Sequence, residues 1–136
     1  MYMWTQHYGR LAKLFYNPRA WHNLFFVVNF YISFTFLLLI WGEAIWAMVV
    51  FRGASFLTLH YSIYFGADWL GSVYNFFIFP AAAMVTIIAN LILANILFDK
   101  KNILAFLLSA SSSLALLFIL VAQSLVLYIN WGATGT

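Results

Sequence analysis

Three long runs of apolar residues dominate the pattern of hydrophobic and polar positions along the chain. The predicted membrane segments are residues 18–50, 76–98 and 103–130, and the first apolar run within them begins at Leu24. Each run reaches the roughly 20 residues that a helix needs to cross a hydrocarbon core about 30 Å thick. The short polar segment Asp99–Asn102 predicts a tight turn that makes the second and third helices antiparallel neighbours. The sequence therefore predicts an all-α membrane protein with three transmembrane helices.

A helical pattern of a different kind precedes the first span. Residues 1–17 place an apolar stripe opposite a polar, basic face, and the stripe consists of Trp4, Tyr8, Leu11 and Phe15. Such a helix is typical of the membrane interface, although its stripe also suits packing against the transmembrane bundle. Asn17 and Pro18 end it, and they supply an N-cap and a first turn for the next helix. Residues 131–136 are interpreted as a tail.

The connection between the first two spans, residues 51–75, is too long to be only a linker. Residues 57–64 alternate apolar and polar side chains, which predicts a short strand. Residues 66–72 are rich in Gly, Asp and Ser, which predicts a compact turn. Because a single strand leaves backbone groups unpaired, we expect this ordered loop to pair with a second copy or a partner subunit, or to lie against the membrane face.

Composition and charge narrow the class of protein. With 66% apolar and 7% charged residues, the chain is neither a soluble domain nor a disordered one. The net charge is +3, but the six basic residues form no patch, so no nucleic acid partner is expected. The absence of Cys excludes disulfides and thiolate metal sites. Five of the six basic residues lie on one side of the predicted spans: Arg10, Lys13, Arg19, Lys100 and Lys101. An excess of basic residues marks the cytoplasmic side, which predicts a cytoplasmic N-terminus and an outer C-terminus.

The loop carries a motif that resembles a known family. The segment Leu59–Ser72 reads Leu-His-Tyr-Ser-Ile-Tyr-Phe-Gly-Ala-Asp-Trp-Leu-Gly-Ser. It is similar to the loop of a bacterial membrane domain of unknown function that also occurs at the N-terminus of SdpI-type toxin-immunity proteins. It resembles still more closely small membrane proteins with a Leu-His-Tyr-x-Ile-Tyr-Phe-Gly-x-Asp segment between two spans. The resemblance covers residues 57–130, and Thr58 stands where the family has Pro. It implies a fold and a side of the membrane, here the bacterial cytoplasmic membrane, but no known chemistry.

The same loop holds the residues most suited to ligand contact. The candidates are the motif residues His60, Tyr61, Gly66, Asp68, Gly71 and Ser72. His60 and Asp68 are close enough in sequence to meet across the strand and turn, and they are weak candidates for a metal site. The alternative is structural: His60 hydrogen-bonds the turn and Asp68 caps it. Glu43, near the outer end of the first span, is a further acidic candidate; no catalytic residue and no cofactor are predicted.

Within the spans, a few polar residues are expected to mediate contacts between helices. The candidates are Asn29, Asn90, Ser109, Ser112, Ser113 and Gln123. From the helix rise, Asn29, Asn90 and Ser112 lie at one level, which favours interhelical hydrogen bonds over a small polar ligand site or proton path. Gln123, alone in the outer half, is expected to face a partner. Small residues are expected to permit close helix approach, namely Ala82, Ala89, Ala94, Ala105, Ser109 and Ser113.

These observations favour a non-enzymatic membrane subunit or accessory protein of a larger or homo-oligomeric assembly, in contact with lipid. One alternative is a small binding or immunity-type protein that captures a peptide, lipid or metal through the outer loop. A third possibility is a membrane enzyme at the outer interface. The enzyme hypothesis predicts that His60→Ala and Asp68→Ala abolish an activity but leave assembly intact, and the subunit hypothesis predicts the reverse.

Overall fold

The structure, a computed structural model, describes residues 16–54, 56–62, 64 and 66–134. The described elements are α2 (Pro18–Trp21), α3 (Leu24–Val50), β1 (Leu57–Ser62), β2 (Gly66–Gly71), the 3-10 helix η1 (Val73–Phe77), α4 (Ile78–Leu97) and α5 (Asn102–Thr134). Of the predicted amphipathic segment 1–17, residues 1–15 lie outside the described residues.

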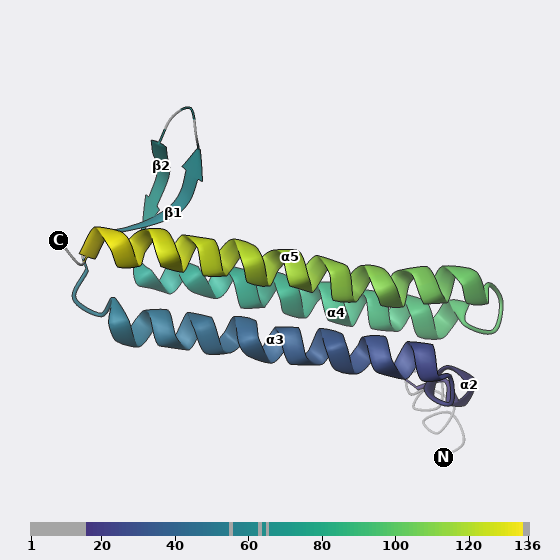
Figure 1. Ribbon diagram of the computed structural model, residues 1–136. Coiled ribbons are helices and arrows are strands. Elements are labelled where there is room, and N and C mark those ends of the chain that lie inside the picture. The colour runs from purple at the N-terminus through teal and green to yellow at the C-terminus, as the bar shows by residue number, and fades with distance from the viewer. Residues whose placement is uncertain (1–15, 55, 63, 65, 135–136) are drawn as a thin grey trace, which may run out of the picture.

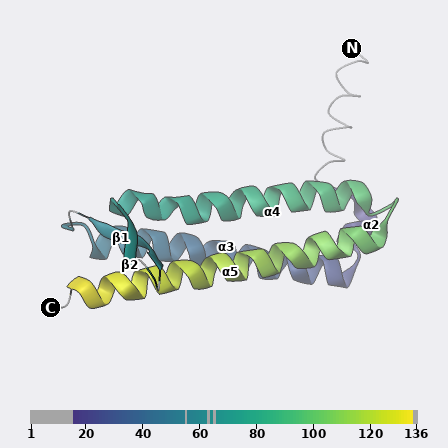
Figure 2. The same cartoon turned by 90° about the horizontal axis from the view of Figure 1, so that it is seen from above.

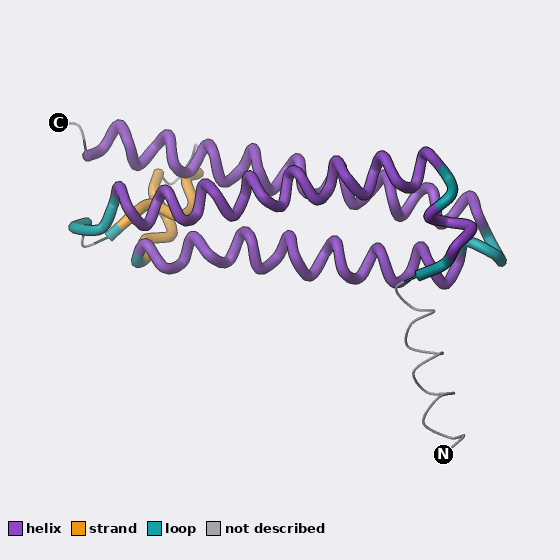
Figure 3. Tube along the Cα trace, turned by 90° about the horizontal axis from the view of Figure 1, so that it is seen from below, coloured by secondary structure: helices purple, strands orange, loops and turns teal. Residues whose placement is uncertain are grey.

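Three long helices, α3, α4 and α5, run side by side (Figures 1 and 2). Each is long and apolar enough to cross a membrane, which confirms the prediction of three spans in an integral membrane protein. The α4–α5 turn lies at the same end as α2, and the strands lie at the other end (Figure 3). We call these the α2 end and the hairpin end.

The helices pack through a seven-residue repeat. The buried residues of α5 follow one another at intervals of three, four or seven: Ala105, Ser109, Ser112, Leu116, Gln123, Leu127 and Asn130. In α3, the buried residues Phe26, Ser33, Ile40 and Ala47 recur every seventh position. Such spacing keeps one seam of each helix facing its neighbours in a left-handed bundle.

The buried seam of α5 is more polar than the surface around it. Four of its seven residues are Ser, Gln or Asn, whereas the exposed side chains include Leu107, Leu114, Phe118 and Leu125. A membrane accounts for this arrangement, because lipid tails solvate leucine and phenylalanine as well as a protein core does. Polar groups, in contrast, need hydrogen-bond partners, which the neighbouring helices and carbonyl groups one turn earlier in the same helix supply.

The helix ends follow local sequence signals. Asn17 caps α2, since its Oδ1 accepts a hydrogen bond from the Arg19 backbone N–H at 3.0 Å. Asn23 caps α3 in the same way, with 3.2 Å from its Oδ1 to the Phe26 nitrogen. The predicted first segment, 18–50, therefore consists of two helices that meet at residues 22–23.

The outer loop contains a β-hairpin in place of the single strand and turn that the sequence predicts. The interpretation of residues 66–72 as a turn is wrong, because Gly66–Gly71 forms β2 and pairs antiparallel with β1. β1 thus finds its partner within the same chain. The pairing is irregular on both sides of His60, which lies opposite Trp69.

The hairpin is attached to the bundle by an apolar cluster. Leu57 and Leu59 of β1 are buried together with Ala44, Ala47, Phe51, Val73, Phe76 and Leu127. Alternate residues of β1 thus point into the bundle, as the sequence pattern predicts for one face of a strand. Beyond this base, the hairpin projects sideways, across the direction of the helices (Figure 1).

Candidate functional site

The loop-motif residues give the hairpin its shape. Gly66 begins β2 with φ of +73°, a left-handed conformation that favours glycine. Gly71 lies so close to the Asn75 side chain and to Leu59 Cδ1 that a Cβ atom there would collide with both. Ser72 precedes η1, and its carbonyl accepts a hydrogen bond from Asn75 N at 3.0 Å.

The pairing register brings His60 and Asp68 to neighbouring positions. His60 is exposed and pairs with Trp69, next to Asp68 on β2. The side chains of Tyr61 and Asp68 lie outside what the structure describes. Among the described residues, no three His, Asp or Glu side chains are grouped as a metal site would require.

Asn130 of α5 holds the hairpin through hydrogen bonds that the sequence analysis missed. Its Oδ1 accepts from the Thr58 backbone N–H at 2.8 Å, and its Nδ2 donates to the Thr58 carbonyl at 2.6 Å. Nδ2 also donates to the carbonyl of Val126, one turn earlier in α5, at 2.8 Å. The sequence signal that could have identified Asn130 is its position as a polar residue at the end of an apolar run.

A polar layer connects α3 and α5 in the half of the bundle nearer the α2 end. Ser113 Oγ donates to the carbonyl and to Oδ1 of Asn29, at 3.0 and 3.1 Å. Its Oγ also lies 3.0 Å from the hydroxyl of Ser33, a buried residue that the sequence analysis did not select. The structure thus brings Asn29 and Ser113 together.

The other predicted polar residues of this layer line a small cavity of about 20 Å³ between the three helices. Its polar lining consists of Asn29, Ser33, Asn90, Ser109 and Ser112. The volume is close to what one water molecule occupies, so the cavity is too small for an organic ligand. Ser112 Oγ is buried and has no hydrogen-bond partner among the described residues.

The small residues of α4 are arranged differently from the expectation. Ala94 is buried against Ala105 of α5 near the α2 end, as close helix packing requires. Ala82 and Ala89 are exposed, however, and Ala83 occupies the buried position of that face. Ala82 and Ala89 therefore make no close helix contact within the chain, because the seven-residue repeat of α4 passes through Pro80, Ala83, Ile87 and Ala94.

Gln123 points into the bundle, so the expectation that it faces a partner is wrong. It is fully buried, and its Nε2 donates to the Ile40 carbonyl of α3 at 3.1 Å. The position belongs to the seam of α5, and this decides its direction. The next residue, Ser124, donates from its Oγ to Glu43 Oε1 of α3 at 2.6 Å. Gln123 and Ser124 therefore tie α5 to one turn of α3.

A groove lies beside this contact, between α3 and α5 at the hairpin end. It has a volume of about 320 Å³ and is lined by Glu43, Trp46, Ser124, Leu127, Tyr128 and Trp131. The rings of Trp46 and Trp131 stack, with centroids 5.4 Å apart and planes 12° from parallel. The sequence predicts Glu43 near this end of the first span, but its pattern does not associate Glu43 with these aromatic residues.

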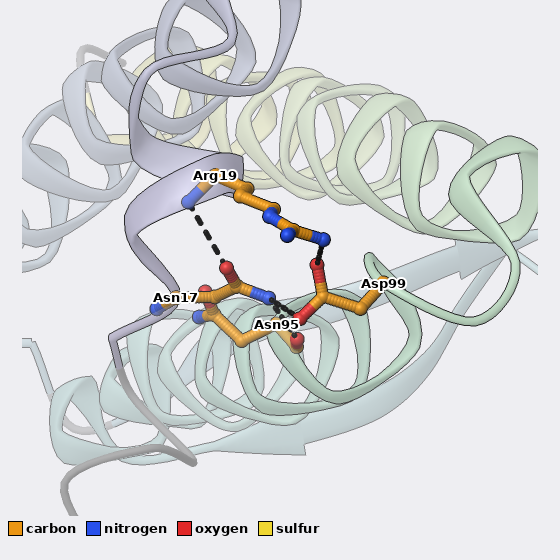
Figure 4. Close-up of polar contacts among 4 residues, drawn as sticks. All are labelled: Asn17, Arg19, Asn95 and Asp99. Carbon is orange, nitrogen blue, oxygen red and sulfur yellow. Dashed lines mark hydrogen bonds and ion pairs between the residues drawn. The ribbon is translucent and has the colours of Figure 1, made fainter.

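A second polar cluster lies at the α2 end, where the chain enters the bundle (Figure 4). Asn17 N donates to Asn95 Oδ1 at 3.3 Å, and Asn17 Nδ2 donates to the Asn95 carbonyl at 3.2 Å and to Asp99 Oδ2 at 3.1 Å. Arg19 Nη1 lies 3.4 Å from Asp99 Oδ1 in an exposed ion pair. Asn95 was not predicted as a contact residue; it is buried in α4, four residues before Asp99 in the α4–α5 turn.

This cluster borders a hollow of about 370 Å³ lined by Tyr16, Asn17, Pro18, Asn95, Ile96, Asp99 and Lys100. Every polar side chain in Figure 4 has a partner within the cluster. The contacts therefore account for how the segment around α2 docks on α4. Comparison of the chain with protein-family models, with curated proteins and with solved structures gives no match.

Proposed function

We propose that this integral membrane protein is a non-enzymatic assembly subunit, and that it binds a second copy of itself through the free edge of β2. The observation that carries the proposal is the sideways projection of the hairpin from the end of the bundle (Figure 1). When the three helices cross a membrane, a hairpin in this direction extends along the membrane surface. The molecules within its reach are then lipids and neighbouring membrane proteins.

The exposed side chains of the hairpin region support this proposal. Phe56, Tyr64, Trp69 and Leu70 are all at least half exposed, with Tyr64 at 91%. Exposed large apolar and aromatic side chains on one short element are typical of an interaction surface. The base of the hairpin is attached to the bundle by buried Leu57 and Leu59 and by Asn130, and these contacts orient it toward a neighbour.

The two edges of the hairpin differ. At Thr58, the outer edge of β1 is occupied by the side chain of Asn130. The described sheet has two strands, so β2 has one edge with no strand beside it. An edge of this kind accepts a further strand through main-chain hydrogen bonds. A second copy supplies a matching edge, because two antiparallel β2 strands related by a two-fold axis are self-complementary.

We also propose that the hairpin end faces the outside of a bacterial cytoplasmic membrane. The basic residues support this orientation, since Arg19 and the pair Lys100–Lys101 belong to the α2 end. Arg52 is the basic residue of the opposite end. An excess of Lys and Arg marks the cytoplasmic side of membrane proteins. The loop resemblance supports the bacterial assignment.

Cysteine cross-linking tests the proposed pairing, because the chain contains no Cys of its own. Trp69→Cys and Leu70→Cys place single thiols on exposed positions of β2, and Lys100→Cys places one at the α2 end as the matched control. In native membranes treated with a short bismaleimide, we expect covalent dimers from the two β2 variants and monomer from Lys100→Cys. Monomer from all three variants, or adducts only to other proteins, would contradict the proposed self-association.

A further inference from the structure

We propose that the groove at Glu43 binds the positively charged ammonium headgroup of a membrane lipid, of the ethanolamine or choline class. This inference does not rest on the proposed self-association, because the groove lies between α3 and α5 of a single chain. Its components are one carboxylate, a stacked pair of indole rings and a phenol ring.

The carboxylate of Glu43 has unused capacity to accept hydrogen bonds. Ser124 donates to Oε1, but Oε2 is buried and has no hydrogen-bond partner among the described residues. One turn deeper in the bundle, Gln123 Oε1 is likewise a buried acceptor to which no described residue donates. This contact between α3 and α5 therefore offers more acceptors than donors, which favours a ligand that brings donors or positive charge.

No basic side chain in the described part of the chain neutralises Glu43. The one ion pair there, between Arg19 and Asp99, lies at the opposite end of the bundle. A carboxylate held away from water is stable when a cation pairs with it. Because the terminal torsion of Glu is soft, rotation of the carboxylate can present an oxygen to a cation in the groove.

The aromatic lining suits an organic ammonium. Trp46 lies one turn above Glu43 on α3, and Tyr128 and Trp131 follow Ser124 on the same face of α5. Trp46, Tyr128 and Trp131 are each exposed by 46% or more, so part of each ring is accessible at the rim of the groove. Faces of Trp and Tyr attract alkylammonium groups, and aromatic cages of this type are the common solution for choline-like ligands.

The depth of the groove favours a lipid over a free amine. α3 has 27 residues and is therefore about 40 Å long, so it extends about 5 Å past each face of a 30 Å hydrocarbon core. Glu43 lies seven residues before Val50, which corresponds to about 10 Å from the helix end. The carboxylate is then about 5 Å inside the boundary with the headgroups. The neighbouring exposed residues Ile45, Val49 and Leu125 are apolar, as expected for a surface that acyl chains cover.

Native mass spectrometry of the purified, delipidated protein tests this proposal. The probes are phosphatidylethanolamine, the same lipid with its amine acetylated, and phosphatidylglycerol, all with identical acyl chains. We expect phosphatidylethanolamine to bind about tenfold more tightly than either other lipid. Glu43→Gln keeps an acceptor for Ser124 and the size of the side chain, so we expect it to fold and to lose this preference.

Two further variants keep the test specific. Asp99→Asn removes a carboxylate at the α2 end and should leave the preference unchanged. Trp131→Phe keeps an aromatic face with a weaker attraction for cations, and its preference should lie between those of the wild type and Glu43→Gln. Equal binding of the three lipids, or an unchanged preference in Glu43→Gln, would overturn the proposal. Displacement of the lipid by millimolar tetramethylammonium would overturn its lipid part, because the groove would then recognise the cation alone.

Discussion

Asn130 of α5 binds both backbone polar groups of Thr58, so that one side-chain amide takes the place of a neighbouring strand. The distances are 2.8 Å from Thr58 N to Oδ1 and 2.6 Å from Nδ2 to the Thr58 carbonyl. An isolated two-stranded hairpin is only marginally stable in water. This amide pairing and the buried Leu57 and Leu59 explain how so small a sheet keeps one orientation on the bundle.

Asn130→Ala should release the base of the hairpin from α5. Two hydrogen bonds at about 1 kcal/mol each correspond to hydrogen exchange about thirtyfold faster at the Thr58 amide. Hydrogen exchange with mass spectrometry on a peptide that contains Thr58 measures this change. Asn130→Asp keeps an acceptor for Thr58 N but places a carboxylate against the Thr58 carbonyl, so it should also accelerate exchange. Unchanged exchange in both variants would mean that the apolar contacts suffice.

Gly71→Ala should disturb the end of β2. A Cβ atom at this position would meet the Asn75 side chain and Leu59 Cδ1, and overpacking of this kind costs about 1–3 kcal/mol. Gly53→Ala is the matched control, since no atom lies within 4 Å of its Cβ position. We expect faster proteolysis of the outer loop in Gly71→Ala only. Equal stability of the two variants would show that Asn75 and Leu59 move aside without cost.

Ser113→Ala and Ser112→Ala should differ although they are neighbours on α5. Ser113 contacts both Asn29 and Ser33, and interhelical hydrogen bonds in membranes contribute about 0.6 kcal/mol each. We therefore expect Ser113→Ala to lower the free energy of unfolding in detergent by about 1 kcal/mol. Ser112 Oγ has no partner among the described residues, so Ser112→Ala should change it by less than about 0.5 kcal/mol. A larger loss of stability in Ser112→Ala than in Ser113→Ala would show that the stabilising hydroxyl is that of Ser112, in the cavity.

Asn17→Ala should loosen α2 from α4. It removes the cap on Arg19 N and the donors to Asn95 and Asp99, and loss of an N-cap alone costs about 1 kcal/mol. Trypsin should then cleave after Arg19 several times faster. Asn17→Asp keeps the cap but sets a second carboxylate beside Asp99. Fast cleavage in this variant as well would show that loss of the contact with α4, and not loss of the cap, accelerates cleavage. Asn102→Ala, at the exposed α4–α5 turn, serves as the control.

Some interhelical contacts were predictable from the sequence, and others were not. Asn29 and Ser112 line the same cavity, because residues at one depth on adjacent helices meet when their rotation permits it. Depth follows from counting residues, but rotation follows from the seven-residue seam. That seam turns Gln123 inward, contrary to expectation. It turns Ala89 outward, where Ala89 does not contribute to packing within the bundle. In a membrane, lipid-facing and buried positions are both apolar, so hydrophobicity alone does not reveal the rotation.

The sequence by itself determined that the protein is a membrane protein with three spans, where the spans turn, and that residues from 57 onward form a strand. These properties depend on local features: run length, charge and the alternation of side chains. Only the tertiary structure decided that Gly66–Gly71 is the partner strand, that Asn130 anchors it, and that Glu43 meets Ser124 beneath a pair of stacked tryptophans. Those contacts join residues as many as 81 positions apart, so local features of the sequence do not reveal them. They form because buried polar groups must find hydrogen-bond partners, and only the folded chain brings those partners within reach.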